Sequence, residues 1–204
     1  MTTAKPTDLS VTPRDIRFEP ATDYVRHWLG GDPVGTAVMN ALSLTFPDGE
    51  RLFVDAVRHY RERLPPALQD DARHFIAQEA LHSREHQALN DLVDPAIYPV
   101  AEILAKIRAR IAMARARGPF GMLVSTIALE HFTAMMAEVH MEAGNRLFAG
   151  AEPRIEQLWR WHALEETEHK AVAYDVFMEV TRHWNPLRRY WLRVWTMALI
   201  TVNF

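Results

Sequence analysis

Residues 159–177 are the stretch that most restricts what this chain can fold into. They contain no proline and no glycine, and their apolar side chains recur at helical spacing, so the sequence predicts one α-helix here. At roughly 100° per residue, His162, Glu166 and His169 lie within about 60° of one another on that helix. The same stripe continues into small and apolar residues of core type. Imidazoles in line with core positions indicate ligands inside a helical bundle rather than a solvated face.

The composition limits the chemistry that the chain can carry out. The 204 residues are most simply one domain, which we expect as a flexible N-terminal arm over 1–20 and a single helical metal-binding domain over 21–204. The absence of cysteine excludes disulfides, thiolate nucleophiles and cysteine-ligated metals. A net charge of −3 without a long basic run argues against a nucleic-acid partner. The N-terminus lacks the apolar core of a secretory signal, so we expect a cytoplasmic protein.

Proline and glycine divide the chain into segments of helix length that show no convincing β-type alternation. The predicted helices are 34–44, 50–64, 68–92, 100–116, 120–143, 154–183 and 186 to the C-terminus. We expect Phe46-Pro47-Asp48-Gly49 to separate the first two helices and 144–153 to form a loop. The sequence therefore predicts an all-α fold.

A second segment, 78–86, carries the same ligand types as the first. Glu79, His82 and His86 lie within about 60° of one another around the predicted helix. Glu-x-x-His places a carboxylate and an imidazole one turn apart, and the same spacing begins again at Glu166, about 87 residues later. A dinuclear carboxylate site in a four-helix bundle takes one such pair from each of two helices and one inward glutamate from each of the other two.

Two further helices offer the inward glutamates. Glu130 shares a face with apolar and small residues, where a carboxylate is costly unless it is paired or binds a metal. Glu50 begins the apolar stripe of 50–64, close to the proline–glycine break. His131 and His140 point about 100° away from the Glu130 face, which favours satisfied or exposed histidines over ligands. The expected metal ligands are Glu50, Glu79, His82, Glu130, His162, Glu166 and His169.

Two residues stay open as additions to this set. His86 is either a further ligand or a hydrogen-bond partner of the ligands. Glu165 is an alternative to Glu166, although the spacing of the first Glu-x-x-His favours Glu166. The alternative to any metal site is that these side chains form ordinary helical surface pairs, such as Glu79 with Arg84.

The same motifs resemble a known family. Phe46-Pro47-Asp48-Gly49-Glu50, Gln78-Glu79-x-x-His82-x-x-x-His86 and Trp161-His162-x-x-x-Glu166-x-x-His169 resemble a bacterial family labelled predicted metal-dependent hydrolase. Over roughly 45–183, the chain also resembles ferritin-like dimetal-carboxylate proteins, which implies a ferritin-like four-helix bundle with additional N- and C-terminal helices. The extra His162 is similar to a ligand of seven-ligand, histidine-rich di-iron N-oxygenases that act on aryl amines. Members of the hydrolase-labelled family continue beyond this chain's last residue, which implies a further lid or membrane-facing region.

The ligand set is compatible with two chemistries. Four carboxylates balance the charge of two Fe(II) ions, which predicts a di-iron oxidase or oxygenase that uses dioxygen on a small organic substrate; manganese and zinc are alternatives to iron. The same metals would also serve a hydrolase that uses a metal-bound hydroxide. A third hypothesis is a non-catalytic bundle that binds metal or a partner.

Residues 186–204 are strongly apolar but too short to span a bilayer. We expect a packing helix here, and the alternative is peripheral contact with a membrane through its aromatic and arginine side chains. The chain stops inside this apolar run, as a truncated product would. A homodimer is compatible with the sequence, which does not fix the oligomeric state.

Overall fold

The fold is all-α, as predicted. A computed structural model describes residues 11–19, 25–142, 144–169 and 171–203. The elements are α1 (Pro33–Tyr60), the 3-10 turn η1 (Arg61–Arg63), α2 (Pro66–Asn90), α3 (Val100–Ala116), α4 (Gly118–Glu142), α5 (Gly144–Leu147), α6 (Pro153–His169), α7 (Val172–Val180) and α8 (Pro186–Asn203). The described ranges contain no β-strand.

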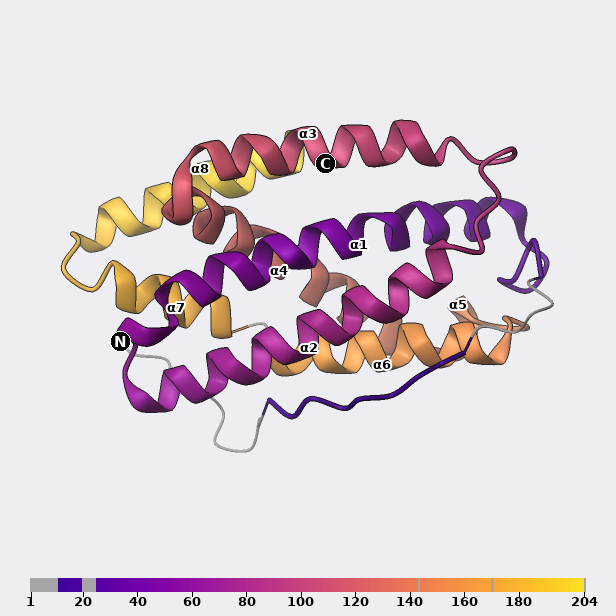
Figure 1. Ribbon diagram of the computed structural model, residues 1–204, viewed down its shortest axis with the longest axis horizontal. Helices are drawn as coiled ribbons and strands as arrows, with labels where there is room; N and C mark the ends of the chain where they lie inside the picture. The colour runs from indigo at the N-terminus through magenta and orange to yellow at the C-terminus, as the bar shows by residue number, and fades with distance from the viewer. Residues whose placement is uncertain (1–10, 20–24, 143, 170, 204) are drawn as a thin grey trace.

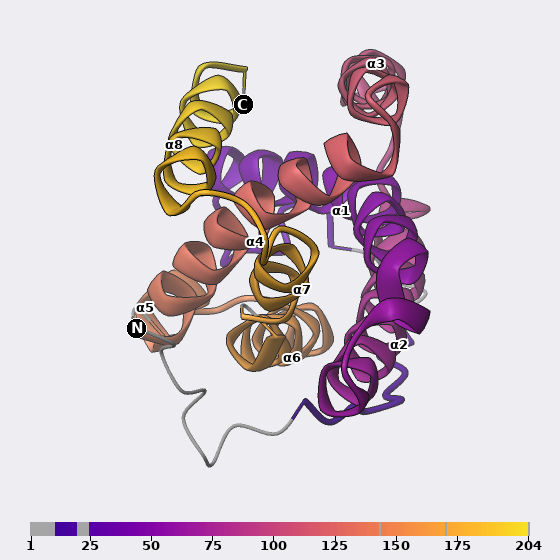
Figure 2. The same ribbon diagram turned by 90° about the vertical axis from the view of Figure 1, so that its left-hand side faces the viewer.

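Four long helical units form the bundle. These units are α1, α2, α4 and the pair α6–α7: α1 packs on α2 and α4, α6 also packs on α2 and α4, and α7 continues the line of α6 (Figures 1 and 2). Helix α3 packs on α1 and α4, and α8 packs on α4, so both lie outside the bundle (Figure 2). The additional C-terminal helix is therefore present, and another extra helix, α3, lies between the second and third helices of the bundle along the chain.

The break predicted at Phe46-Pro47-Asp48-Gly49 does not occur, and 34–44 and 50–64 belong to one helix, α1. Proline has no N–H, so Pro47 cannot donate to the carbonyl oxygen of Ser43 one turn earlier. The Asn90 side chain on α2 donates to that oxygen instead, with Nδ2 at 3.1 Å. A hydrogen bond from another helix thus replaces the bond that the proline removes. The extra N-terminal helix expected from the resemblance is the first half of α1.

Two other boundaries differ from the sequence prediction. The helix expected over 154–183 is divided into α6 and α7, with a non-helical turn at Ala171. No proline or glycine stands near that point, and nothing in the described contacts explains the division. The loop expected over 144–153 contains the short helix α5.

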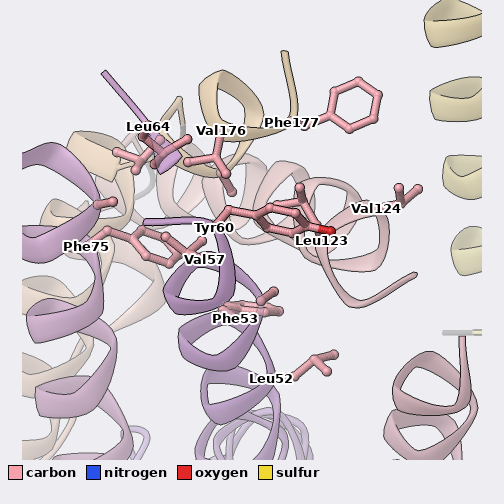
Figure 3. Close-up of a cluster of buried hydrophobic side chains, with 14 of the residues drawn as sticks. Leu52, Phe53, Val57, Tyr60, Leu64, Phe75, Leu123, Val124, Val176 and Phe177 are labelled. Carbon is pink, nitrogen blue, oxygen red and sulfur yellow. The ribbon is translucent and has the colours of Figure 1, made fainter. Parts of the chain in front are cut away.

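Apolar side chains form two clusters in the bundle. One cluster joins the second half of α1 to the start of α2, the start of α4 and α7, with Phe53, Phe75 and Phe177 among its members (Figure 3). The other joins the first half of α1 to the end of α2 and to α6, with Phe46 and Trp159 among its members. Between the two clusters, all four helical units carry buried carboxylates or imidazoles.

Residues 11–19 lie along α2 and α6 (Figure 1). Arg14 Nη1 is 3.1 Å from Glu165 Oε1, and Arg14 Nη2 is 2.5 Å from Glu168 Oε1. The Phe18 N–H donates to Glu85 Oε2 at 3.0 Å. The part of the predicted N-terminal arm that the structure describes is therefore tied to the bundle by charged groups.

Replacing Arg14 by alanine should lower the free energy of unfolding. Glu165 is fully buried, and loss of the guanidinium would leave its carboxyl without its cationic partner, at a cost of about 1–3 kcal/mol. Urea titration followed by circular dichroism measures this. The control is Arg61→Ala, which removes a solvent-exposed pair with Glu62 and should cost less than about 1 kcal/mol. Equal effects of the two substitutions would contradict a specific role of Arg14.

Helix α8 exposes large apolar side chains, and helix α4 is apolar along most of its length. Trp191, Trp195 and Leu199 on α8 are 54%, 64% and 61% exposed. By length and composition alone, α4 over Gly118–Met141 is apolar enough to cross a membrane, a test that core helices also pass. Helix α4 carries the buried Glu130 on its bundle side. Peripheral membrane contact through 186–204 stays a prediction.

Candidate metal centre

Four glutamates from four helices meet inside the bundle. Glu50 lies on α1, Glu79 on α2, Glu130 on α4 and Glu166 on α6, and each is at most 2% exposed. Burial of one ionised carboxylate costs several kcal/mol unless a cation compensates it. Glu50 and Glu166 lie within ion-pair distance of the imidazoles of His82 and His162. The cluster therefore has the charge pattern of a cation site.

Burial and mutual repulsion alter the acidity of these groups. Burial is the largest cause that raises the pKa of Glu79 well above its usual value, and the charges of Glu130, Glu166 and Glu50 add to it. A hydrogen bond between Glu79 and Glu130 also favours a protonated carboxyl. Burial likewise raises the pKa of Glu50, although Ser83 Oγ donates to Glu50 Oε2 at 2.8 Å and opposes the shift. Without a cation, these carboxyls hold protons more tightly than exposed ones do.

His82 lies at the centre of the cluster. Its Nδ1 is 3.7 Å from Glu166 Oε1, and its Nε2 is 3.1 Å from Glu165 Oε2 on the opposite side of the ring. Glu165 in turn contacts Arg14, so His82 has a carboxylate partner behind it that is itself held by a cation. This carboxylate–histidine arrangement is the one that orients metal-binding imidazoles.

His162 lies against His82, with ring centroids 4.2 Å apart and planes inclined by 20°. Its Nε2 is 2.9 Å from Glu166 Oε1 and 3.9 Å from Glu50 Oε1. Its Nδ1 points the other way and is 2.6 Å from His86 Nε2. One nitrogen of His162 therefore faces the carboxylates, and the other faces a second histidine.

The arrangement fits metal ions held by oxygen and nitrogen donors. The ligand atoms form two groups, and within each group they lie within 4.8 Å of one another: Glu50, His82 and His162 make one group, and Glu79, His82 and Glu166 make the other. Glu50 Oε1 is buried and has no hydrogen-bond partner among the described residues, as a ligand atom would be without its ion. Carboxylate and imidazole donors without thiolates suit iron, manganese or zinc.

Not every expected ligand can be placed in the cluster. His169 ends α6, and its side chain lies outside the described part of the chain. Glu165 lies behind His82 rather than beside the other carboxylates, and Glu166 takes the position inside the cluster. His86 lies behind His162, where burial lowers its pKa well below the usual value. The spacing argument that preferred Glu166 to Glu165 thus agrees with the geometry.

A small pocket adjoins the cluster, and His140 lines it. Apolar side chains form most of its wall, and His162 and Glu166 of the cluster also line it. The pocket has room for about one water-sized molecule. Burial lowers the pKa of His140 to about 4, so this imidazole is neutral at pH 7. The sequence argument placed His140 away from the Glu130 face of the helix. The spacing of His140 from Thr133 and Ala137 would instead have put the three residues on one face of α4, the face that lines the pocket. His131 is exposed.

A comparison with protein families identifies one matching family. The model of a family described as predicted metal-dependent hydrolase matches residues 12–204. The chain belongs to this family. Among curated proteins and among solved structures, no match was found. The match covers the bundle, α8 and nearly all of the N-terminal segment 11–19.

Proposed function

We propose that this protein, a member of the predicted metal-dependent hydrolase family, is a ferritin-like enzyme with a dinuclear metal centre. The observation that carries the proposal is the meeting of four buried glutamates, one from each helical unit, with His82 and His162. Two divalent cations would balance four carboxylates, whereas one would leave an excess negative charge in the core. The proposed ligands are Glu50, Glu79, His82, Glu130, His162, Glu166 and His169.

We propose iron as the metal and a small organic molecule as the substrate. A pair of iron ions held by these side chains would supply dioxygen activation for an oxidase or oxygenase. The pocket beside His162 and Glu166 supports this choice, because it is mostly apolar and water-sized, which suits dioxygen. Phe46 and Trp159 line it and would exclude bulk water from the cluster.

Within the site, each residue has a distinct task. Glu165 would hold His82 by its Nε2 so that Nδ1 faces the cluster. Ser83 would hold one oxygen of Glu50 and leave the other oxygen available as a ligand. His140 is neutral at pH 7, so it can donate a hydrogen bond to a molecule in the pocket, or accept one from it, without adding charge.

Metal-assisted hydrolysis is the second candidate, and the description of the family favours it. The same ligands would hold redox-inert ions such as zinc. Hydrolysis requires water at the metals, and both candidates require access for a substrate larger than the pocket admits in the described conformation. The two candidates therefore differ in the metal and in the need for oxygen.

Elemental analysis of freshly purified protein, paired with its visible spectrum, tests the proposal. About two irons per chain, with an absorption band that appears when the reduced protein meets air, is the expected result. Two zinc ions and no spectral response to oxygen would shift the assignment to hydrolysis. Absence of bound metal, together with no uptake of added Fe(II) or Zn(II), would refute the dinuclear centre.

A further inference from the structure

A chain of hydrogen bonds connects the proline of α1 to the metal centre. It starts at the carbonyl oxygen of Ser43, which receives no helical hydrogen bond from Pro47. Asn90 Nδ2 donates to this oxygen at 3.1 Å. Since only the NH₂ end of the amide can donate, the orientation of the Asn90 side chain is fixed, and its Oδ1 becomes the acceptor for another group.

That group is the hydroxyl of Ser43. Ser43 Oγ lies 2.7 Å from Asn90 Oδ1, and because an amide oxygen cannot donate, the hydroxyl proton lies between them. A serine hydroxyl has one proton, so Ser43 Oγ can only accept from its other neighbour, His86 Nδ1, at 2.9 Å. The proton of the His86 ring therefore lies on Nδ1.

The same counting extends to His162. With its proton on Nδ1, the neutral ring of His86 has a lone pair on Nε2, which lies 2.6 Å from His162 Nδ1. His162 must then donate from Nδ1 and keep a lone pair on Nε2. This Nε2 is the nitrogen 2.9 Å from Glu166 and 3.9 Å from Glu50. The lone pair therefore faces the cluster, as a ligand atom requires.

We propose that Asn90, Ser43 and His86 are positioning residues that hold the proton of His162 on Nδ1 and so present Nε2 to the metal. The inference rests on the proposed metal centre and assigns His86 to the support of a ligand rather than to the ligands. If every hydrogen bond of this series were donated in the opposite direction, Asn90 would have to present its NH₂ group to Ser43 Oγ. The carbonyl of Ser43 would then lose its donor.

The two histidines of the cluster are thus supported differently. A carboxylate, Glu165, lies behind His82, whereas an uncharged chain of hydrogen bonds lies behind His162. All members of that chain are buried, with Ser43 and His86 fully inaccessible and Asn90 at 7% exposure. Water is therefore poorly placed to substitute for a missing member.

Removal of the Ser43 hydroxyl tests the chain through metal affinity. Ser43→Ala should weaken binding of Zn(II), measured by competition with a chelator, by about 10–100-fold, as is typical for residues that support a ligand. Ser43→Thr keeps a hydroxyl and should restore most of the affinity. Thr181→Val removes a buried hydroxyl just after α7 that donates to the Phe177 carbonyl oxygen of that helix, and it should leave zinc affinity unchanged. Equal affinity of wild type and Ser43→Ala would overturn the proposal.

NMR of the ring nitrogens in the metal-free wild type tests the chain without any substitution. The expected result is a protonated Nδ1 and a bare Nε2 in His86 at neutral pH; a protonated Nε2 would overturn the proposal. Failure of the wild type to bind zinc would instead refute the metal centre, and the His86 tautomer would still decide the direction of the chain. The two proposals therefore fail by different observations.

Discussion

Metal-free protein carrying Glu79→Gln should be more stable than metal-free wild type at pH 7. The folded carboxyl of Glu79 has a raised pKa, so it holds its proton more tightly than the unfolded carboxyl at 4.5. The protonated Glu79 carboxyl contributes to the free energy of unfolding in full below pH 4.5, and this contribution is lost as the pH rises from there through the pKa of the folded state. The loss is about 1.4 kcal/mol for each pH unit in this window. Glutamine is neutral at every pH and avoids the loss.

The measurement is the free energy of unfolding in urea, with chelator present, at several pH values. The advantage of the variant should shrink as the pH falls and vanish below about 4.5. The same variant should lose metal binding, because an amide is a poor substitute for a bridging or chelating carboxylate. The control is Glu102→Gln on the exposed surface of α3, which should change neither quantity. A Glu79→Gln protein that is less stable at pH 7 would contradict the predicted buried acid.

Loading with metal should raise the melting temperature of the wild type by at least about 5 °C. A ligand that binds only the folded state at 100 times its Kd contributes about 2.7 kcal/mol. One kcal/mol corresponds to about 2–4 °C for a chain of this size. The physical cause is the relief of repulsion among Glu50, Glu79, Glu130 and Glu166, which lie within the protein core.

Differential scanning calorimetry with and without Fe(II) or Zn(II) measures the shift. Glu166→Gln should abolish most of it, because Glu166 takes part in one of the two clustered ligand groups. Glu156→Gln changes a glutamate at the surface of the same helix and should keep the full shift. If both variants respond to metal as the wild type does, the ions bind elsewhere.

The helical periodicity was enough to predict the fold class and the inward faces of the helices. Glu79 and His82 lie one turn apart on α2, and Glu166 lies one turn after His162 on α6, so each pair shares a face whatever the rest of the chain does. The glutamate of α4 was recognisable because apolar neighbours surround it. These features depend on residues within a few turns of one another. The assignment of the residues as ligands stays a prediction.

Features that depend on distant residues could not be predicted. A proline inside a helix kinks or breaks it by local rules, yet α1 continues through Pro47, where Asn90 on the next helix bonds the carbonyl that the proline leaves. The side of His162 that carries the proton depends on the same residue, through Ser43 and His86. No pattern along the chain reports which amide end of an asparagine faces a serine 47 positions away.

The proline within α1 also bears on which substitutions this bundle can accept. Replacing a proline inside a helix by alanine restores a backbone N–H donor. At Pro47 the new N–H would compete with Asn90 for the Ser43 carbonyl oxygen and so release the amide from its orientation. The substitution would give α1 a regular backbone hydrogen bond and at the same time loosen the hold on the Asn90 side chain. Regularity of the helix and orientation of that amide are therefore opposed at this position.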